Sequence, residues 1–333
     1  MNKKISIVIP VYNEENFILK CLDSVYSQDY PNNLMEIIVI DGESRDRTVE
    51  LIKQYFGNVK VLNNPDRIVP ISMNIGIKEA KGEYIVRLDA HCEYPQNYLK
   101  RLINRISQGD IDNVGGVLET LPYDDSNKSK AIATALSTRF GVGNSHFRVG
   151  ATKEIDVDTV PFGCFPKEVF IKYGLYDKEL VRNQDDELNA RILKGGGRIV
   201  LLSDVTIKYY SRNSIIKVAK MFFQYGLYKP LVNNKLKKVT SLRQLVPLLL
   251  MIGLILGAAI SLFFSLFRMF YITGLLLYVV LNLFASLNNS RTPMIFGYLF
   301  ICYPVIHFSY GWGYLNGIFK ILFNKPFNVN NNR

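Results

Sequence analysis

The sequence has few cysteines and none of the spacings that would group them. Cys21, Cys92, Cys164 and Cys302 are scattered, and no two of them form a C-x-x-C pair. This spacing gives no zinc site, and so few thiols suit a reducing compartment. The first residues enter a strand pattern without a long apolar signal region, so we expect the soluble part to stay on the cytoplasmic side.

Acidic residues are absent after Asp204. From Leu201 onward the chain carries 14 lysines and arginines against that single acid, whereas the preceding residues include 26 basic and 28 acidic side chains. The basic third is also the most apolar part of the chain. This combination favours a membrane over nucleic acid as the partner, and no nucleic-acid-binding motif argues otherwise.

The first 90 residues alternate between two hydrophobic periods. Short apolar runs predict strands at 5–12, 36–41, 59–62 and 84–89, and helical spacing predicts helices at 17–25, 44–55 and 71–81. This alternation indicates a doubly wound α/β sheet, in which ligands bind beyond the carboxyl ends of the strands. The polar segments 12–14, 41–42 and 89–91 all fall at such ends.

The stretch Tyr84-Ile-Val-Arg-Leu-Asp-Ala-His91 organises the rest of the chain. It is a buried strand with a polar tip, where Asp89 and His91 at i, i+2 spacing point to the same side. A carboxylate beside an imidazole can hold a divalent cation, and the cation can hold a diphosphate. Alone, the pair is more typical of a solvated strand-end turn; the neighbouring motifs favour the cation.

Three motifs occur in a specific order: Val8-Ile-Pro-Val-Tyr-Asn-Glu-Glu15, Asp41-Gly-Glu-Ser-Arg-Asp-Arg-Thr48 and Asp89-Ala-His91. Together they resemble the nucleotide-site motifs of the family 2 inverting glycosyltransferases, over residues 4–230. The resemblance implies a Rossmann-like nucleotide-sugar domain of the GT-A type with a mostly parallel sheet. Within the family, the chain looks most like membrane-associated bacterial enzymes of exopolysaccharide assembly, of the succinoglycan type.

The resemblance also implies a nucleotide site. Its nucleotide-binding residues are Pro10, Tyr12, Asn13, Glu14, Asp41 and Asp89. Asp41, at a strand end, can accept a hydrogen bond from a uracil N–H or a ribose hydroxyl. A solvated glutamate in the first turn of a helix is the alternative for Glu14.

The metal site follows from the same resemblance. Asp89 takes the place of the family's first aspartate, which contacts ribose and metal, and His91 takes the place of the second, which coordinates metal. Histidine fits Mn²⁺ at least as well as Mg²⁺. We therefore expect a divalent cation, Mn²⁺ or Mg²⁺, at Asp89 and His91.

A second acidic motif, Asn183-Gln-Asp-Asp-Glu-Leu-Asn-Ala-Arg191, opens a predicted helix. Acids at a helix N-terminus are favoured by the helix dipole, so a purely structural cluster is one interpretation. The family has Glu-Asp-x-Glu-Leu-x-x-Arg here, which implies that Asp185 is the catalytic base. Gln184 replaces the family's glutamate, and Asp186 remains a competing candidate.

Three further segments have weaker signals. By the resemblance, Gly163 and Cys164, in an apolar turn, line the sugar and acceptor pocket, with Gln184 and Asp186; a core-forming loop is the alternative. The glycine-rich stretch 140–146 fits no P-loop and predicts a mobile acceptor loop or a plain connector. Arg212 is a candidate phosphate contact, although a lipid headgroup is the stronger alternative.

The predicted organisation has four parts. These are a cytoplasmic catalytic domain at 1–212, a basic amphipathic interfacial helix and linker at 213–243, a transmembrane region at 244–323, and a tail at 324–333.

The transmembrane region contains apolar segments at 245–267, 270–287 and 294–323, with Arg268 expected to force a hairpin between the first two. Three spans would place the basic C-terminus outside, against the positive-inside rule, so a re-entrant or interfacial third segment is the alternative.

We therefore expect a metal-dependent inverting glycosyltransferase of polysaccharide biosynthesis. It would transfer a sugar from a nucleoside diphosphate, UDP being favoured, to a polyprenyl phosphate or a lipid-linked saccharide. A multi-pass protein of the cell membrane is expected, with a homo-oligomer left open. The alternatives are an inactive membrane scaffold or transport partner, and a nucleotidyltransferase of similar fold.

Overall fold

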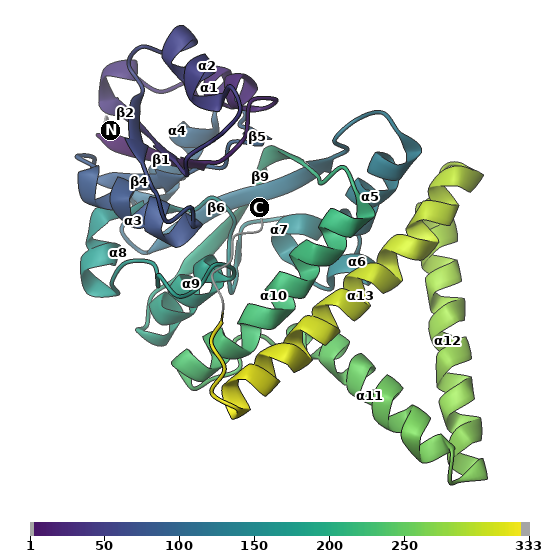
Figure 1. Cartoon of the computed structure of the whole chain (residues 1–333). Coiled ribbons are helices and arrows are strands. Elements are labelled where there is room, and N and C mark those ends of the chain that lie inside the picture. The colour runs from purple at the N-terminus through teal and green to yellow at the C-terminus, as the bar shows by residue number, and fades with distance from the viewer. Residues whose placement is uncertain (1–2, 328–333) are drawn as a thin grey trace. The chain divides into compact units, whose positions relative to one another are not determined.

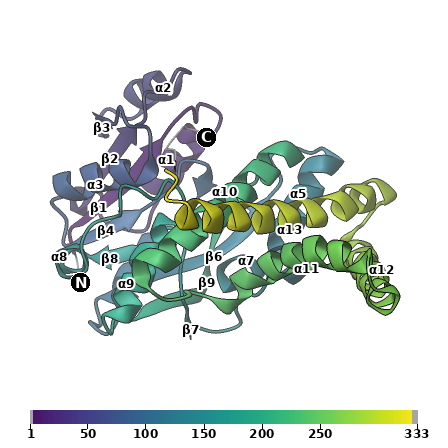
Figure 2. The same cartoon turned by 60° about the horizontal axis from the view of Figure 1, so that its bottom comes forward.

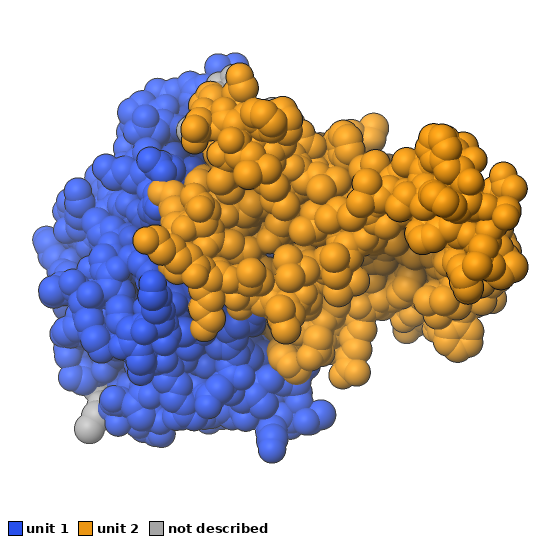
Figure 3. Space-filling model, turned by 90° about the horizontal axis from the view of Figure 1, so that it is seen from below, with its two compact units in different colours: residues 1–119, 150–209, 328–333 blue, residues 120–149, 210–327 orange. Residues whose placement is uncertain are grey.

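The chain forms two compact units in the computed structural model, which describes residues 3–327. Unit 1 contains the chain up to residue 119 and residues 150–209, whereas unit 2 contains residues 120–149 and 210–327 (Figure 3). The segment 120–149 thus belongs to the same unit as the C-terminal helices. The sequence pattern, which places it inside a catalytic domain ending at residue 212, gave no sign of this division.

Unit 1 is built on one mixed sheet (Figure 1). Its strands are β1 (Ile5–Val11), β2 (Met35–Asp41), β3 (Lys60–Asn63), β4 (Tyr84–Arg87), β5 (Cys92–Glu93), β6 (Asn113–Leu121), β7 (Ile155–Asp156), β8 (Cys164–Pro166) and β9 (Ile199–Tyr210). Their order is β3-β2-β1-β4-β8-β6-β9-β5, and β7 pairs with β9. The predicted α/β sheet is confirmed, because β1 pairs in parallel with β2 and β4, and β2 with β3.

The later strands depart from the parallel pattern. Strand β8 runs antiparallel to β4 and β6, and β9 runs antiparallel to β5 and β7. These strands come from the part of the sequence where the pattern loosens. They extend the sheet past β4, so the tip that follows β4 lies near the middle of the sheet.

Strand β1 is buried at every position, which explains its nearly continuous apolar sequence. Helix α3 packs on β1 and β2. The helices of unit 1 are α1 (Ile18–Tyr26), α2 (Thr48–Tyr55), α3 (Val69–Glu79), α4 (Tyr98–Ile106), α8 (Lys167–Lys172) and α9 (Gln184–Lys194), with a 3₁₀ turn at Asn32–Leu34.

Unit 2 is helical. It contains α5 (Asn127–Ser137), α6 (Arg139–Val142), α7 (His146–Val149), α10 (Ile215–Leu236), a 3₁₀ turn at Leu242–Leu245, α11 (Val246–Ser261), α12 (Ser265–Asn289) and α13 (Pro293–Leu322). Helices α10 and α13 lie side by side (Figures 1 and 2). One apolar cluster joins α5, α10 and α13 through residues such as Leu136, Phe222 and Tyr303.

Three segments each have the length and composition to cross a membrane: Leu242–Ser261, which joins the 3₁₀ turn to α11, and the helices α12 and α13. The predicted break between the first two segments is misplaced. The chain leaves the helical conformation at Leu262–Phe264, and Arg268 lies inside α12. A single arginine does not interrupt the hydrogen bonds of a helix, so its charge was a poor guide to the turn.

Candidate active site

The loops after β1 and β2 are tied together by hydrogen bonds. Asn13 has a left-handed backbone (φ 55°), and its N–H donates to Ser44 Oγ over 2.9 Å. The Arg45 N–H donates to Asn13 Oδ1 over 2.8 Å, and the Glu14 N–H donates to Thr48 Oγ1 over 2.7 Å. The two predicted nucleotide-site loops therefore form one rigid polar rim at the carboxyl ends of their strands.

Asp41 is the last residue of β2 and is only 8% exposed. Both its carboxylate oxygens lie within 3.2 Å of the Ser44 N–H, which donates to them. A carboxylate has about four acceptor positions, so Asp41 keeps capacity for a nucleoside group. Pro10 is buried inside β1 and Tyr12 follows it, half-buried, at the rim. The nucleotide-binding roles of these residues stay predictions.

The tip after β4 brings three predicted residues together. His91 Nδ1 lies 3.3 Å from Glu14 Oε1, and His91 Nε2 lies 4.0 Å from Asp89 Oδ2. The imidazole also packs edge-on against Tyr209, with ring centroids 5.3 Å apart. The Asp89 N–H donates to Tyr94 Oη over 2.8 Å, and this hydrogen bond holds the backbone of the tip in place.

This arrangement suits a cation-binding histidine. An Nδ1–H donated to the Glu14 carboxylate fixes the tautomer and leaves the lone pair of Nε2 on the side of Asp89. Within residues 3–327 no third histidine, cysteine or acid joins this pair as a metal ligand. Two protein ligands leave room for phosphate oxygens and water, as in other Mg²⁺ and Mn²⁺ sites that bind nucleotides. The donor set therefore fits a divalent cation.

A buried arginine extends this polar line to the predicted base. Arg87, the last residue of β4, is 6% exposed, and its guanidinium donates to Asp185 Oδ1. Its other terminal nitrogen lies 4.0 Å from Asp89 Oδ1. Glu14, His91, Asp89, Arg87 and Asp185 thus form a continuous series across the carboxyl end of the sheet. The Arg87 guanidinium lies between the carboxylates of Asp89 and Asp185.

Burial and charge act in opposite directions on the Arg87–Asp185 pair. Burial raises the pKa of Asp185, and the Arg87 guanidinium opposes that rise. Burial alone would lower the pKa of Arg87, but Asp185 and Asp89 raise it above its usual range. The Asp185 side chain is nevertheless 31% exposed, so a substrate hydroxyl can reach it. Since Oδ1 accepts from Arg87, Oδ2 is the oxygen available to take a proton.

Helix α9 fixes Asp185 in its first turn. Asn183, with a left-handed backbone (φ 60°), precedes the helix, and Gln184 is buried. Later in the helix, Glu187 pairs with Arg191 over 2.6 Å, and Arg191 donates to the Leu175 carbonyl over 2.7 Å. Asp185 is the acid of this turn that bonds to Arg87, which separates it from Asp186.

The other predicted site residues lie in different surroundings. The Gly163 carbonyl accepts from the Arg87 N–H over 3.0 Å, so this turn borders the site through its backbone. Cys164 lies in β8 and its side chain is fully buried, which leaves only its backbone to face a ligand. Arg212 belongs to unit 2, between β9 and α10, and its phosphate contact stays a prediction.

Sequence reasoning missed Arg87 as a site residue. The strand pattern assigns it only to the buried run, although a charged side chain between Val86 and Leu88 in such a run is a usable signal. A buried charge is costly unless it is paired, so an arginine in such a strand predicts a nearby carboxylate. The partner, Asp185, is 98 positions away in the sequence, and only the fold reveals it.

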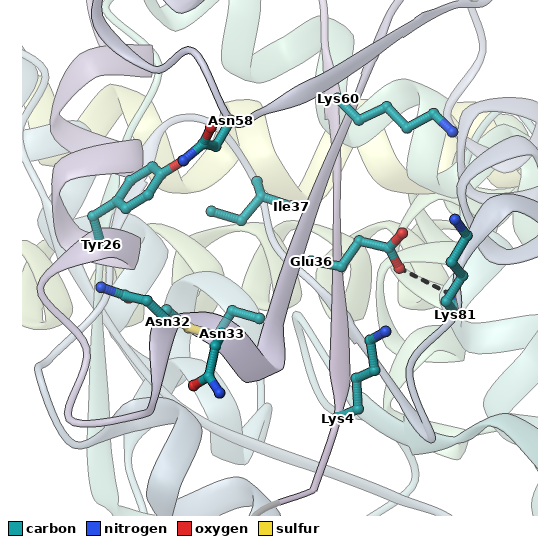
Figure 4. Close-up of a pocket in the computed structure, with 10 residues that line it drawn as sticks. Lys4, Tyr26, Asn32, Asn33, Glu36, Ile37, Asn58, Lys60 and Lys81 are labelled. Atoms are coloured by element: carbon teal, nitrogen blue, oxygen red, sulfur yellow. Dashed lines mark hydrogen bonds between the residues drawn. The ribbon is translucent and has the colours of Figure 1, made fainter.

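The structure also contains a surface hollow of about 500 Å³ at the opposite end of the parallel strands (Figure 4). It is lined by Lys4, Glu36, Lys60 and Lys81 among others, near the amino ends of the parallel strands. The Lys81 N–H donates to Glu36 over 2.9 Å. None of the predicted site residues lines this hollow, so the carboxyl-end series remains the candidate active site.

Comparison with known proteins identifies the class. Residues 6–174 match the family model described as "Glycosyl transferase family 2". The succinoglycan biosynthesis protein ExoA of Rhizobium meliloti is 30% identical over 73% of this chain and 74% of its own length. The chain belongs to glycosyltransferase family 2 and is a glycosyltransferase.

One further relative and one solved structure match nearly the whole chain. A dolichyl N-acetyl-alpha-D-glucosaminyl phosphate 3-beta-D-2,3-diacetamido-2,3-dideoxy-beta-D-glucuronosyltransferase of Methanococcus voltae is 28% identical, over 95% of this chain and 97% of its own. The solved mannosyltransferase PcManGT from Pyrobaculum calidifontis, in complex with GDP-Man and Mn²⁺, has a TM-score of 0.62 and 17% identity. It covers 98% of this chain and 88% of its own, which confirms the predicted GT-A-like fold.

Proposed function

We propose that this protein transfers a sugar, with inversion, from a nucleoside diphosphate sugar to a lipid-linked acceptor at the cytoplasmic face of the membrane. The favoured donor is a UDP-sugar, and the acceptor is a polyprenyl phosphate or a saccharide carried on it. The observation that carries this proposal is the series Glu14–His91–Asp89–Arg87–Asp185. In this series the proposed cation ligands and the proposed base lie together at the carboxyl ends of the parallel strands, which supports the proposal.

The acceptor class rests on two separate observations. The relative from Methanococcus voltae is named for action on a dolichyl-phosphate-linked sugar. This chain itself has long apolar helices and a strongly basic C-terminal third, which favour a membrane location. A membrane-bound transferase meets its lipid-linked acceptor at the headgroup level.

In the proposed reaction Asp185 acts as the general base. It takes the proton of the acceptor hydroxyl as that oxygen attacks the anomeric carbon, from the face opposite the diphosphate. Arg87 donates a hydrogen bond to Oδ1 of Asp185, which fixes the orientation of the carboxylate and of its second oxygen, Oδ2. A divalent cation at Asp89 and His91 supplies positive charge for the leaving diphosphate when it is bound. Glu14 orients the His91 imidazole for that role.

A thermal-shift panel tests the donor site on the detergent-purified full chain. UDP, GDP, CDP and ADP are each added with Mn²⁺, with Mg²⁺ or with EDTA. A nucleotide at 100 times its Kd stabilises the fold by about 2.7 kcal/mol, so binding is visible. We expect UDP to raise the melting temperature and EDTA to weaken its effect. Stabilisation by none of the nucleotides under any condition would overturn the proposed site.

Replacing Arg87 tests the positioning of the base. In Arg87→Gln we expect kcat to fall about 10²-fold, because the Asp185 carboxylate is no longer held in direction. The lost charge also lets burial raise the pKa of Asp185 further, so the acidic limb of the kcat profile moves to higher pH. The measurement is the pH dependence of kcat and of the donor KM.

Two variants serve as controls for this prediction. Arg101→Gln removes an exposed arginine that pairs with Asp204 at the surface, and it should leave kcat unchanged. Arg87→Lys keeps the charge and should recover part of the rate. If Arg87→Gln lowers only the melting temperature and leaves the kcat profile in place, Arg87 has a structural role alone.

A further inference from the structure

Helix α13 is long enough to cross a bilayer, yet another helix covers one side of it. At 30 residues it extends about 45 Å. Helix α10 packs on it with the two backbones almost in contact. A Cβ on Gly226 would lie 2.0 Å from the Tyr310 carbonyl oxygen, and one on Gly313 would lie 2.1 Å from that of Phe223. Because α10 exposes Lys217 and Lys220, it belongs in the headgroup region rather than among acyl chains.

The middle of α13 contacts a polar segment that precedes α10 in the sequence. His307, halfway along α13, has Nε2 2.7 Å from the Phe140 carbonyl oxygen, which accepts its hydrogen bond. Thr138 Oγ1 donates to Tyr303 Oη over 3.1 Å. Arg139, between these two contacts, is exposed. An exposed arginine beside the midpoint of α13 is costly at the bilayer centre and suits the headgroups.

Helices α11, α12 and α13 form the sides of a triangle (Figure 1). The start of α11 abuts α13, where a Cβ on Gly311 would lie 2.3 Å from the Pro247 carbonyl oxygen. The second half of α12 also abuts α13, since Tyr278 Oη lies 3.0 Å from His307 Nδ1 and Asn282 Nδ2 donates to the Phe300 carbonyl over 2.9 Å. If α11 enters the bilayer and α12 returns, both of these contacts lie on the side where α11 began. Helix α13 joins them and so stays on that side.

Aromatic residues agree with this placement. Tyrosine and tryptophan concentrate at membrane–water interfaces, so in a spanning helix they gather at the two ends. In α13 the exposed ones are Tyr298, 36% exposed, and Trp312, 51% exposed, and Trp312 lies near the middle of the helix. This distribution is typical of a helix that lies within the interface.

The tip between α11 and α12 has the opposite character. Leu262, Phe263 and Phe264 are 77%, 81% and 62% exposed, and all three are apolar. The lone charge nearby, Arg268, is long enough to reach a headgroup. Exposure of these three apolar side chains to water would be unfavourable, so they fit the acyl-chain region on the far side of the bilayer.

We propose that only α11 and α12 enter the lipid bilayer, as a hairpin, and that α13 lies along its cytoplasmic surface with α10. The basic residues Lys320 and Lys325 then remain on the cytoplasmic side, with Lys235 and Lys237, which satisfies the positive-inside rule. This inference rests on the proposed membrane location. It does not require the proposed reaction.

The chain has a single tryptophan, Trp312, which is 51% exposed on α13 and reports the depth of that helix directly. The unmodified protein is reconstituted into vesicles whose lipids carry bromine either near the headgroup or near the acyl chain end. A surface helix predicts stronger quenching by the shallow bromines. In a spanning α13, Trp312 would lie about 7 Å from the centre of the bilayer, and stronger quenching by the deep bromines would overturn the proposal.

Cysteine labelling provides a second, independent readout. The four native cysteines are buried, so background labelling is expected to be low. Single exposed cysteines are introduced in the full chain as Lys217→Cys in α10 and Asn324→Cys after α13. A membrane-impermeant maleimide is applied to inverted and to right-side-out vesicles. Labelling of both variants in the inverted vesicles supports the proposal, and labelling of the two from opposite sides overturns it.

These measurements are separate from the test of function. Neither needs a nucleotide, a metal or turnover, so an absent donor site leaves them interpretable. Conversely, the thermal-shift panel is carried out in detergent and does not depend on how α13 lies. A deep Trp312 together with clear UDP binding would therefore refute the topology and keep the enzyme.

Discussion

Asp185→Asn is expected to lower kcat by about 10³-fold, within the range that a general base contributes, while donor binding is retained. The amide has nearly the shape of the carboxylate but cannot take the proton of the acceptor hydroxyl. The ion pair with Arg87 is also lost, so of the two acids that pair with its guanidinium within residues 3–327, Asp89 remains. The measurement is kcat with a lipid-linked acceptor, together with the thermal shift that UDP produces.

The adjacent acid provides a matched control. Asp186 lies in the same helical turn as Asp185 and is similarly half-buried, but the carboxylate that accepts from Arg87 in this turn is that of Asp185. Asp186→Asn should therefore keep kcat within a few-fold of the native value (about 1 kcal/mol). A large loss in Asp186→Asn with normal turnover in Asp185→Asn would reverse the two assignments. Equal losses in both would point to the helix terminus rather than to one base.

Local patterns were enough to predict the parallel half of the sheet. Strands β1, β2 and β4 are short apolar runs followed by polar residues, and those polar residues meet at one edge because the strands are parallel. The proximity of Glu14, Asp89 and His91 follows from that rule alone. In the antiparallel half, β5, β7 and β8 could not be read in the same way, because they are only two or three residues long. Segments that short do not show a hydrophobic period from which a strand can be predicted.

The link to Asp185 required tertiary information. Helix α9 was recognisable from its spacing, and the family resemblance selected Asp185, but neither pattern indicates which strand faces it. Its partner proved to be Arg87, on the strand that also leads to the predicted cation site. The same limit applies to α5, whose burial against α10 and α13 depends on contacts across more than 80 positions.

The membrane region shows how composition and packing can disagree. Hydropathy measures whether a helix tolerates lipid, and by that measure α13 qualifies as well as α11 and α12. Packing shows what the helix contacts instead, and α13 is covered on one side by α10 and α5. A helix that is apolar on one face and packed against basic amphipathic neighbours on the other is typical of an interface.

Asp89→Ala is expected to lower kcat/KM by about 10³-fold, which corresponds to about 4 kcal/mol of transition-state stabilisation. The change removes one of the two side chains that would hold the cation, and His91 alone is a weak site. It also removes the acid that lies 4.0 Å from Arg87, although Arg87 keeps its bond to Asp185, so the fold should survive. The measurement is the Mn²⁺ dependence of both the rate and the UDP thermal shift.

Two control variants distinguish the loss of a cation ligand from the loss of any acidic side chain. Asp29→Ala removes a surface carboxylate that pairs with Lys100, and it should change neither quantity. Glu14→Gln keeps a hydrogen-bond acceptor for His91 Nδ1, so it should weaken the response to Mn²⁺ far less than Asp89→Ala does. If Asp89→Ala keeps a Mn²⁺-dependent UDP shift of native size, the cation is held elsewhere. Loss of that shift together with the rate, in a protein of normal melting temperature, would make Asp89 the residue that joins the nucleotide to the metal.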